Sequence, residues 1–230
     1  RLADFARTAA GDDRVLPRLH THAAEQLDEV ALVRARYGQG NIAALSQLGL
    51  AGERAVLAHC VHLDSDELSL LARGGTHVAH CPSSNLKLGS GIAPIVELLS
   101  AGVNVAIGAD GAPCNNRLDG LHELRLAALL QKGRHGPTAL PAAQALRLAT
   151  LGGARALGLD SRIGTLQPGK RADVIVLSRG ALSMQPRHAA DSQVVYAATA
   201  GDVRHVLVDG RLLVQGGSLR PETGLDVERL

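Results

Sequence analysis

Short apolar runs alternate with amphipathic stretches through the first two thirds of the chain. Four of these runs have the length of buried strands, and each is followed by a segment in which apolar residues recur at helical spacing. The predicted strands cover residues 15–22, 55–60, 76–81 and 103–110. Because successive strand ends are separated by one strand–helix unit, the pattern predicts a parallel sheet with right-handed crossovers.

The predicted helices are amphipathic and lie between or after these strands. They cover residues 41–48, 65–73, 92–101, 118–131 and 141–157. The last of them has Pro141 in its first turn and Gly158 just past its end, which is the usual placement of these two residue types. The pair Gly152-Gly153 interrupts this helix, which predicts close packing or a kink there.

From Ile163 onward the pattern is that of β structure. It predicts a strand over 172–177, a short helix over 191–199, a hairpin over 203–214 that turns at Asp209-Gly210, and a tail over 221–230. The chain therefore divides into residues 1–160, with four strand–helix units, and residues 161–230, a small β appendage. A closed eight-stranded barrel needs roughly 250 residues. The expected fold class is therefore α/β, with half of such a barrel in the first part.

Composition narrows the class of protein. The 230 residues are 46% hydrophobic, and 24 Lys and Arg against 22 Asp and Glu give a formal net charge of +2. This balance argues against a dedicated nucleic-acid binder. No apolar stretch reaches the ~18 residues of a membrane helix, the start has no signal sequence, and three widely spaced cysteines suit a reducing compartment. We expect a cytoplasmic protein, and the absence of Met at Arg1 predicts a piece of a longer one.

Each predicted strand of the first part ends in a residue that can bind a metal or transfer a proton. These residues are His22, His59, His80 and Asp110, and Glu25 follows the first of them. In a βα barrel the carboxyl ends of the strands form the floor of the active site, so these side chains should converge. Histidine and carboxylate are ligands of zinc-type ions, and metal-activated water needs a neighbouring carboxylate to move its proton. His22 and Asp110 are the predicted ligands and Glu25 is the predicted base.

Several neighbouring residues have simpler interpretations. His20 shares a strand face with His22, so that His20-Thr21-His22 could be a paired-ligand motif, but we favour a packing role for His20. His62 and His77 are expected to be structural. The polar segment 81–91 either contacts a substrate or caps the helix that follows it. Cys114 has no identifiable base beside it, which argues against a thiol nucleophile.

Seven sequence blocks stand out: HAAE at 22–25, HCVHL at 59–63, HCPSSNLKLGSGIAP at 80–94, GADG at 108–111, NNRLD at 115–119, ELRLAALLQ at 123–131 and IGTLQPGKRAD at 163–173. Together they resemble the amidohydrolase superfamily, in its branch of N-heterocycle deaminases. They follow the order of the family and cover nearly the whole chain. They are most similar to the deaminases of methylthioadenosine, S-adenosylhomocysteine and 5′-deoxyadenosine. Guanine and 8-oxoguanine deaminases and s-triazine hydrolases are near neighbours.

The resemblance implies roles for four residues. His22 would be the metal ligand of the fifth strand of a (β/α)8 barrel, and Glu25 the proton shuttle that also contacts the purine. His59 would orient the attacking water or the substrate from the sixth strand. Asp110 would be the metal ligand and proton acceptor of the eighth strand. The implied cofactor is one divalent ion, zinc above all, although iron and manganese also suit these ligands.

The implied reaction is the hydrolytic deamination of a purine or adenosine-like heterocycle, with release of ammonia. The family also has an HxH ligand pair on its first strand and a small β-sandwich formed by both chain ends. His20-Thr21-His22 is followed by only three more strand–helix units, so it cannot be that first-strand pair. We therefore expect the C-terminal half of the barrel (strands 5–8) with part of the sandwich, a missing N-terminal half as partner, and weak metal binding alone. The family makes homo-oligomers an ordinary outcome. The alternatives are a guanine, 8-oxoguanine or s-triazine substrate, and an inactive truncated half-barrel.

Overall fold

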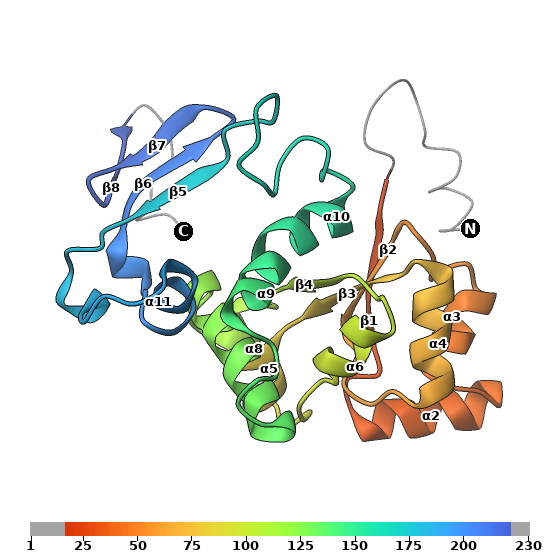
Figure 1. Cartoon of the computed structure of the whole chain (residues 1–230). Helices are drawn as coiled ribbons and strands as arrows, with labels where there is room; N and C mark the ends of the chain where they lie inside the picture. The colour runs from red at the N-terminus through yellow and green to blue at the C-terminus, as the bar shows by residue number, and fades with distance from the viewer. Residues whose placement is uncertain (1–16, 222–230) are drawn as a thin grey trace.

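Four parallel strands in chain order form the first sheet of the computed structural model, which describes residues 17–221 (Figure 1). They are β1 (Leu19–Ala23), β2 (Ala55–His59), β3 (His77–His80) and β4 (Val105–Ile107). The predicted parallel sheet is confirmed, and the carboxyl ends of all four strands lie at one edge. β1 begins later than predicted, after Pro17, which has no amide hydrogen for a strand ladder. Residues 15 and 16 lie outside the described range.

Helices connect and cover these strands. They are α2 (Leu27–Tyr37), α3 (Asn41–Gln47), α4 (Ser65–Gly74), α5 (Pro82–Lys87), α6 (Ile95–Ser100), α7 (Ala112–Asn115) and α8 (Gly120–His135). Local signals explain their ends: the Asp64 side chain caps α4 by accepting from the amides of Asp66 and Glu67, and Gly75 ends it at φ +63°. We predicted no helix within 81–91, but α5 lies there. Its single apolar residue, Leu86, leaves no periodic pattern to detect.

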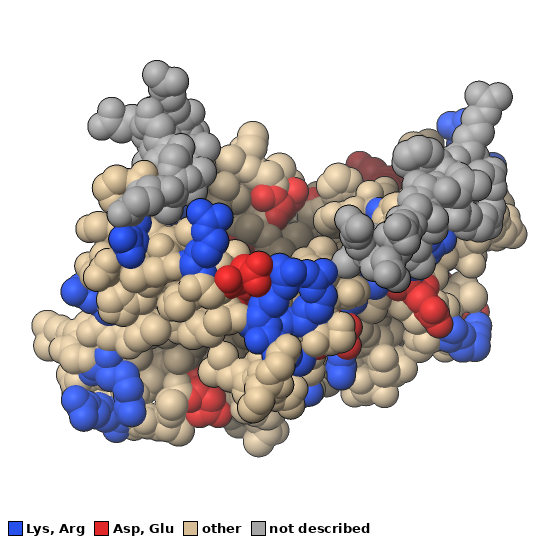
Figure 2. Space-filling view, turned by 90° about the horizontal axis from the view of Figure 1, so that it is seen from above, with Lys and Arg blue, Asp and Glu red and all other residues tan. Residues whose placement is uncertain are grey.

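The main hydrophobic core joins the parallel sheet to its helices. Leu57, Val78 and Val105 enter it from β2, β3 and β4, and Leu71 of α4 and Leu124 of α8 pack in the same cluster. The core is aliphatic, as the scarcity of aromatic residues predicts. No helix between residues 17 and 221 is both long enough and apolar enough to cross a membrane. Lys and Arg are interspersed with Asp and Glu on the face shown in Figure 2.

The predicted packing role of His20 is wrong. His20 and His22 project from the same face of β1, and both are exposed. The side chains beside them on β2, Val56 and Ala58, are in register with these two histidines. β1 is an edge strand within residues 17–221, so no strand lies on its other side and His20 stays open to solvent there.

The second sheet is antiparallel and lies to one side of the first (Figure 1). Its strands in order are β5 (Val174–Leu177), β6 (Val203–Val208), β7 (Arg211–Gln215) and β8 (Ser218–Leu219), and α11 (Ala190–Tyr196) precedes β6. The predicted hairpin is confirmed: Asp209 and Gly210, at φ +51° and +77°, form the turn between β6 and β7. The predicted tail begins at residue 221 and lies otherwise outside the described residues.

One continuous helix covers 142–157, as predicted, with a π turn in its middle. It consists of α9 (Ala142–Arg147), the π turn (Leu148–Gly152) and α10 (Gly153–Leu157). A Cβ atom on Gly152 would overlap the main-chain oxygen of Val105, whereas Gly153 has open space around it. The close packing predicted for the glycine pair is therefore confirmed, and Gly152 alone is responsible for it.

Candidate metal centre

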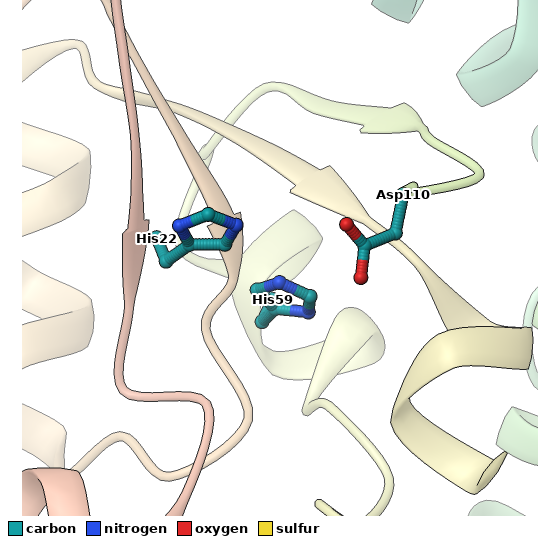
Figure 3. A group of neighbouring side chains, drawn as sticks. All are labelled: His22, His59 and Asp110. Atoms are coloured by element: carbon teal, nitrogen blue, oxygen red, sulfur yellow. The ribbon is translucent and has the colours of Figure 1, made fainter. Parts of the chain in front are cut away.

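Three of the predicted strand-end residues meet at the carboxyl edge of the parallel sheet (Figure 3). One ligand atom from each of His22, His59 and Asp110 lies within 4.8 Å of the other two. The rings of His22 and His59 are stacked, with centroids 5.2 Å apart and planes 17° from parallel. The carboxylate of Asp110 faces the two rings from the loop after β4 (Figure 3).

Unusual backbone conformations place two of these side chains. Strict alternation along β2 would send His59 to the same side as Leu57, into the core. Instead, φ is +71° at His59 and +49° at Cys60, so the strand ends and the His59 ring turns toward His22. Asp110 likewise has φ +61°. Residues other than glycine rarely adopt this left-handed backbone conformation, because it costs free energy. Such residues cluster at functional sites.

Glu25 lies beside this group, as predicted. Its Oε2 atom is 3.6 Å from Nε2 of His59. Its other oxygen accepts a hydrogen bond of 3.2 Å from the Ser90 hydroxyl, which itself accepts one of 2.6 Å from Gln26. The carboxylate is thus held at the edge of the group, within reach of a molecule bound between Glu25 and Asp110.

Asp110 is held in its ionised form. Partial burial opposes ionisation, but hydrogen bonds from the Ser84 hydroxyl (2.6 Å) and the Gly111 amide (2.7 Å), together with nearby His59, outweigh it and lower the pKa of Asp110. An anionic carboxylate beside two imidazoles is a suitable ligand set for a divalent cation. Partial desolvation and the Asp110 carboxylate raise the pKa of Cys114, which keeps that thiol protonated, in line with our argument against a nucleophile.

His59 supplies an observation that favours a ligand at this site. Its Nδ1 atom lies 2.8 Å from the side-chain oxygen of Asn85, which is buried. Its Nε2 atom is also buried, yet it has no hydrogen-bond partner among residues 17–221. Buried ring nitrogens normally have partners. The unpaired nitrogen, next to His22, Glu25 and Asp110, fits a metal ion or its water.

Sequence reasoning missed the residues that hold the site together. Ser84, Asn85 and Ser90 all lie in the segment 81–91, for which we had considered only substrate contact or helix capping. Each of them instead bonds a functional side chain. The available signal was the position of the segment, which follows a strand at the same edge as the other strand ends.

His80 ends β3 but does not join the group. It is fully buried, and neither ring nitrogen has a partner in the described range. Burial, and to a lesser extent His59, lower the pKa of His80 to about 3, so the ring is neutral. His77, at the start of β3, contacts the Glu53 carbonyl (3.1 Å) and the Asn104 amide (3.0 Å) and is structural, as predicted.

The buried His80 predicts a pH-dependent stability. The unfolded chain binds a proton at this ring below about pH 6.5, whereas the folded chain does so only near pH 3. The free energy of unfolding should therefore fall by about 1.4 kcal/mol per pH unit from this group as the pH drops below 6.5. Urea unfolding at pH 7, 6 and 5 should show a shallower decline in His80→Phe than in the unmodified protein. Equal declines would contradict the prediction.

Comparison with known proteins identifies relatives of this chain. The profile of the amidohydrolase family matches residues 17–213. The chain is 49% identical over 230 residues to the 5-methylthioadenosine/S-adenosylhomocysteine deaminase of Moorella thermoacetica, covering 100% of this chain and 52% of that protein. The chain thus spans about half the length of the curated relatives it matches.

Solved structures agree with the sequence match. A zinc-bound adenosine deaminase from Xanthomonas campestris superposes with a TM-score of 0.87 at 43% identity, covering 92% of this chain and 48% of that one. The zinc complex of atrazine chlorohydrolase from Arthrobacter aurescens TC1 superposes with a TM-score of 0.86 at 31% identity, covering 99% of this chain and 48% of the other. Both matched proteins contain zinc.

Proposed function

Since this chain belongs to the amidohydrolase family, we propose that it forms half of the catalytic barrel of a zinc-dependent deaminase of adenosine-like compounds. The observation that carries the proposal is the meeting of His22, His59 and Asp110, with ligand atoms within 4.8 Å, beside the carboxylate of Glu25. The deaminase relatives support the substrate class.

In this proposal His22 and Asp110 hold the ion, and zinc fits them best. Bound zinc would lower the pKa of water to about 7 and so make it nucleophilic at neutral pH. His59 orients the water or the substrate with its free Nε2 atom. Asp110 would accept one proton of the attacking water as the carbon–oxygen bond forms and pass it to the amino group, which leaves as ammonia when the carbon–nitrogen bond breaks. Glu25 would protonate the ring nitrogen during the attack and take back the second proton of the added oxygen as the product carbonyl forms.

The proposal also includes the fold of the two parts of the chain. Residues 1–160 would form strands 5–8 of a (β/α)8 barrel, and residues 161–230 part of a β-sandwich. β1 and β4 are edge strands within the described range, which leaves both sides of the sheet available for further strands. Ile175 and Val176 on β5 and the nearby Leu166 are exposed apolar residues, as expected of a sheet that is covered in a larger domain. A cytoplasmic location remains part of this proposal.

We further propose that the partner of this chain is the N-terminal half of the same protein, with the remaining metal ligands. The test compares two polypeptides: the 230-residue chain, and the same chain preceded by the upstream sequence of its gene. Each is dialysed against a chelator-free buffer and assayed for zinc content. Ammonia release is then measured with 5′-deoxyadenosine, methylthioadenosine, guanine and 8-oxoguanine.

We expect the longer polypeptide to retain zinc and to release ammonia fastest from the adenosine-like compounds. The 230-residue chain should retain little zinc and turn over little, because two ligands hold the ion poorly. Stoichiometric zinc in the short chain would contradict the proposed half-site. Faster turnover of guanine or 8-oxoguanine would show that the substrate is a guanine-type base and not an adenosine-like compound. If no compound releases ammonia, the proposed deaminase activity is rejected.

A further inference from the structure

A single short segment bonds the functional side chains that come from three different strand ends. We call residues 82–90 the α5 segment. Its contacts run from Ser84 to Asp110, from Asn85 to His59 and from Ser90 to Glu25. The three contributing side chains are at most 2% exposed. The placement of the α5 segment therefore decides the relative placement of the groups in the candidate metal centre.

Glu123 of α8 anchors this segment without entering the site. Its side chain is 1% exposed, and its Oε2 atom accepts a hydrogen bond of 3.0 Å from the amide of Ser83, in the first turn of α5. No side chain caps α5 at Cys81. The Glu123 carboxylate therefore takes the place of a capping side chain for the Ser83 amide, next to Ser84.

The second oxygen of Glu123 reaches the loop that carries Asp110. It accepts a hydrogen bond of 2.9 Å from the Asn115 side-chain amide. The same amide nitrogen donates to the carbonyl of Ala109, the residue before Asp110, at 2.7 Å. One buried carboxylate thus links α8 to the α5 segment and to the loop after β4.

We propose that Glu123 is a positioning residue of the metal centre, acting through Ser83 on one side and Asn115 on the other. Charge-assisted hydrogen bonds to a buried carboxylate are strong and directional. Partners of metal ligands fix ligand orientation, and their loss typically weakens metal binding about 10- to 100-fold. Glu123 does not bond a metal ligand itself. It bonds Ser83 on one side and Asn115 on the other, and so acts on both the α5 segment and the loop that carries Asp110. Its effect on zinc rests on the proposed metal centre, whereas its effect on catalysis rests on the proposed deaminase reaction as well.

A purely structural role for Glu123 would predict a different outcome, and the chain offers a matched control. Glu67 of α4 is also a buried carboxylate, 4% exposed, and it accepts from the amides of Ile42 and Asp64. Its partners belong to α3 and to the cap of α4. No hydrogen bond described for Glu67 leads to His22, His59 or Asp110.

The experiment compares Glu123→Gln with Glu67→Gln in the full-length protein. In each variant an NH2 group replaces one acceptor oxygen, so that one of two donors loses its partner, and both should lose comparable stability. Zinc affinity is measured by competition with a fluorescent chelator. We expect it to fall about 10-fold or more in Glu123→Gln and to stay within about twofold in Glu67→Gln. The kcat for 5′-deoxyadenosine should fall with the zinc held saturating, while KM stays nearly constant.

Equal zinc affinity in Glu123→Gln and the unmodified protein, or equal losses in both variants, would overturn the proposal. If Glu123→Gln does not fold, Asn115→Ala cuts the branch toward Asp110, together with the bonds that Asn115 accepts from the amides of Arg117 and Leu118. Weaker zinc binding in Asn115→Ala supports the proposal and unchanged binding overturns it. An unmodified protein that releases no ammonia, with weaker zinc binding in Glu123→Gln, would reject the deaminase and retain the positioning role.

Discussion

Replacing Asp110 with asparagine is expected to lower the kcat of the proposed ammonia release by about 1,000-fold in the longer polypeptide of the test above. The amide still fits between the Ser84 hydroxyl and the Gly111 amide, which hold the carboxylate in place. It cannot accept a proton from water at neutral pH, however, and it is a weaker ligand for a divalent cation. The zinc content after dialysis should fall in parallel with the rate, and both are measured on the same sample.

The control for this substitution is Asp119→Asn. Asp119 lies nine positions further on, and its side chain caps α8 by accepting from the amides of Leu121 and His122. Asparagine caps helices as well as aspartate does, so activity should stay within about twofold of the unmodified protein. If Asp110→Asn retains a tenth of the activity or more, Asp110 is neither the ligand nor the proton acceptor.

Replacing Gly152 with alanine is expected to lower the free energy of unfolding by about 3 kcal/mol or more. The new Cβ atom would overlap the main-chain oxygen of Val105, the first residue of β4. Backbone cannot rotate away as a side chain can, so either the helix over 142–157 or the strand must shift. Urea unfolding followed by circular dichroism measures the loss.

The neighbouring glycine provides the opposite expectation. Gly153 has no atom within 4 Å of the place where its Cβ would lie, and it occupies a helix interior. Gly153→Ala should therefore raise the free energy of unfolding by about 0.5–1 kcal/mol, because alanine loses less conformational freedom in a helix. Equal effects of the two substitutions would show that the contact between Gly152 and β4 is not rigid.

The gathering of His22, Glu25, His59 and Asp110 at one edge of the sheet could be predicted from topology, but the left-handed backbone that turns His59 and Asp110 toward His22 could not. Parallel strands in chain order bring their carboxyl ends to one edge, whatever the sequence of the loops. His80 shows the limit of this argument. It also ends a strand, but alternation along β3 puts its ring on the same face as Val78, in the core, and no left-handed residue at 80 or 81 turns it away as one does at His59.

The supporting contacts could not be predicted from patterns in the sequence. Ser90 and Glu25 are 65 positions apart, and Ser83 and Glu123 are 40 apart. Polar side chains have no periodicity that identifies such partners, whereas the apolar face of a helix repeats every turn. The short helix α5 was not predicted for the same reason. The exposure of His20 depends on which strands lie beside β1, which the local pattern does not show.

The left-handed backbone at His59, Cys60 and Asp110 has a consequence for the stability of the chain. Glycine adopts such φ values freely, and each other residue there costs the fold about 1 kcal/mol or more. Glycine at His59 or Asp110 would relieve this cost, but it would remove an imidazole or the carboxylate from the candidate metal centre. At these two positions the chain therefore gives up stability where it holds the side chains that could bind a metal ion.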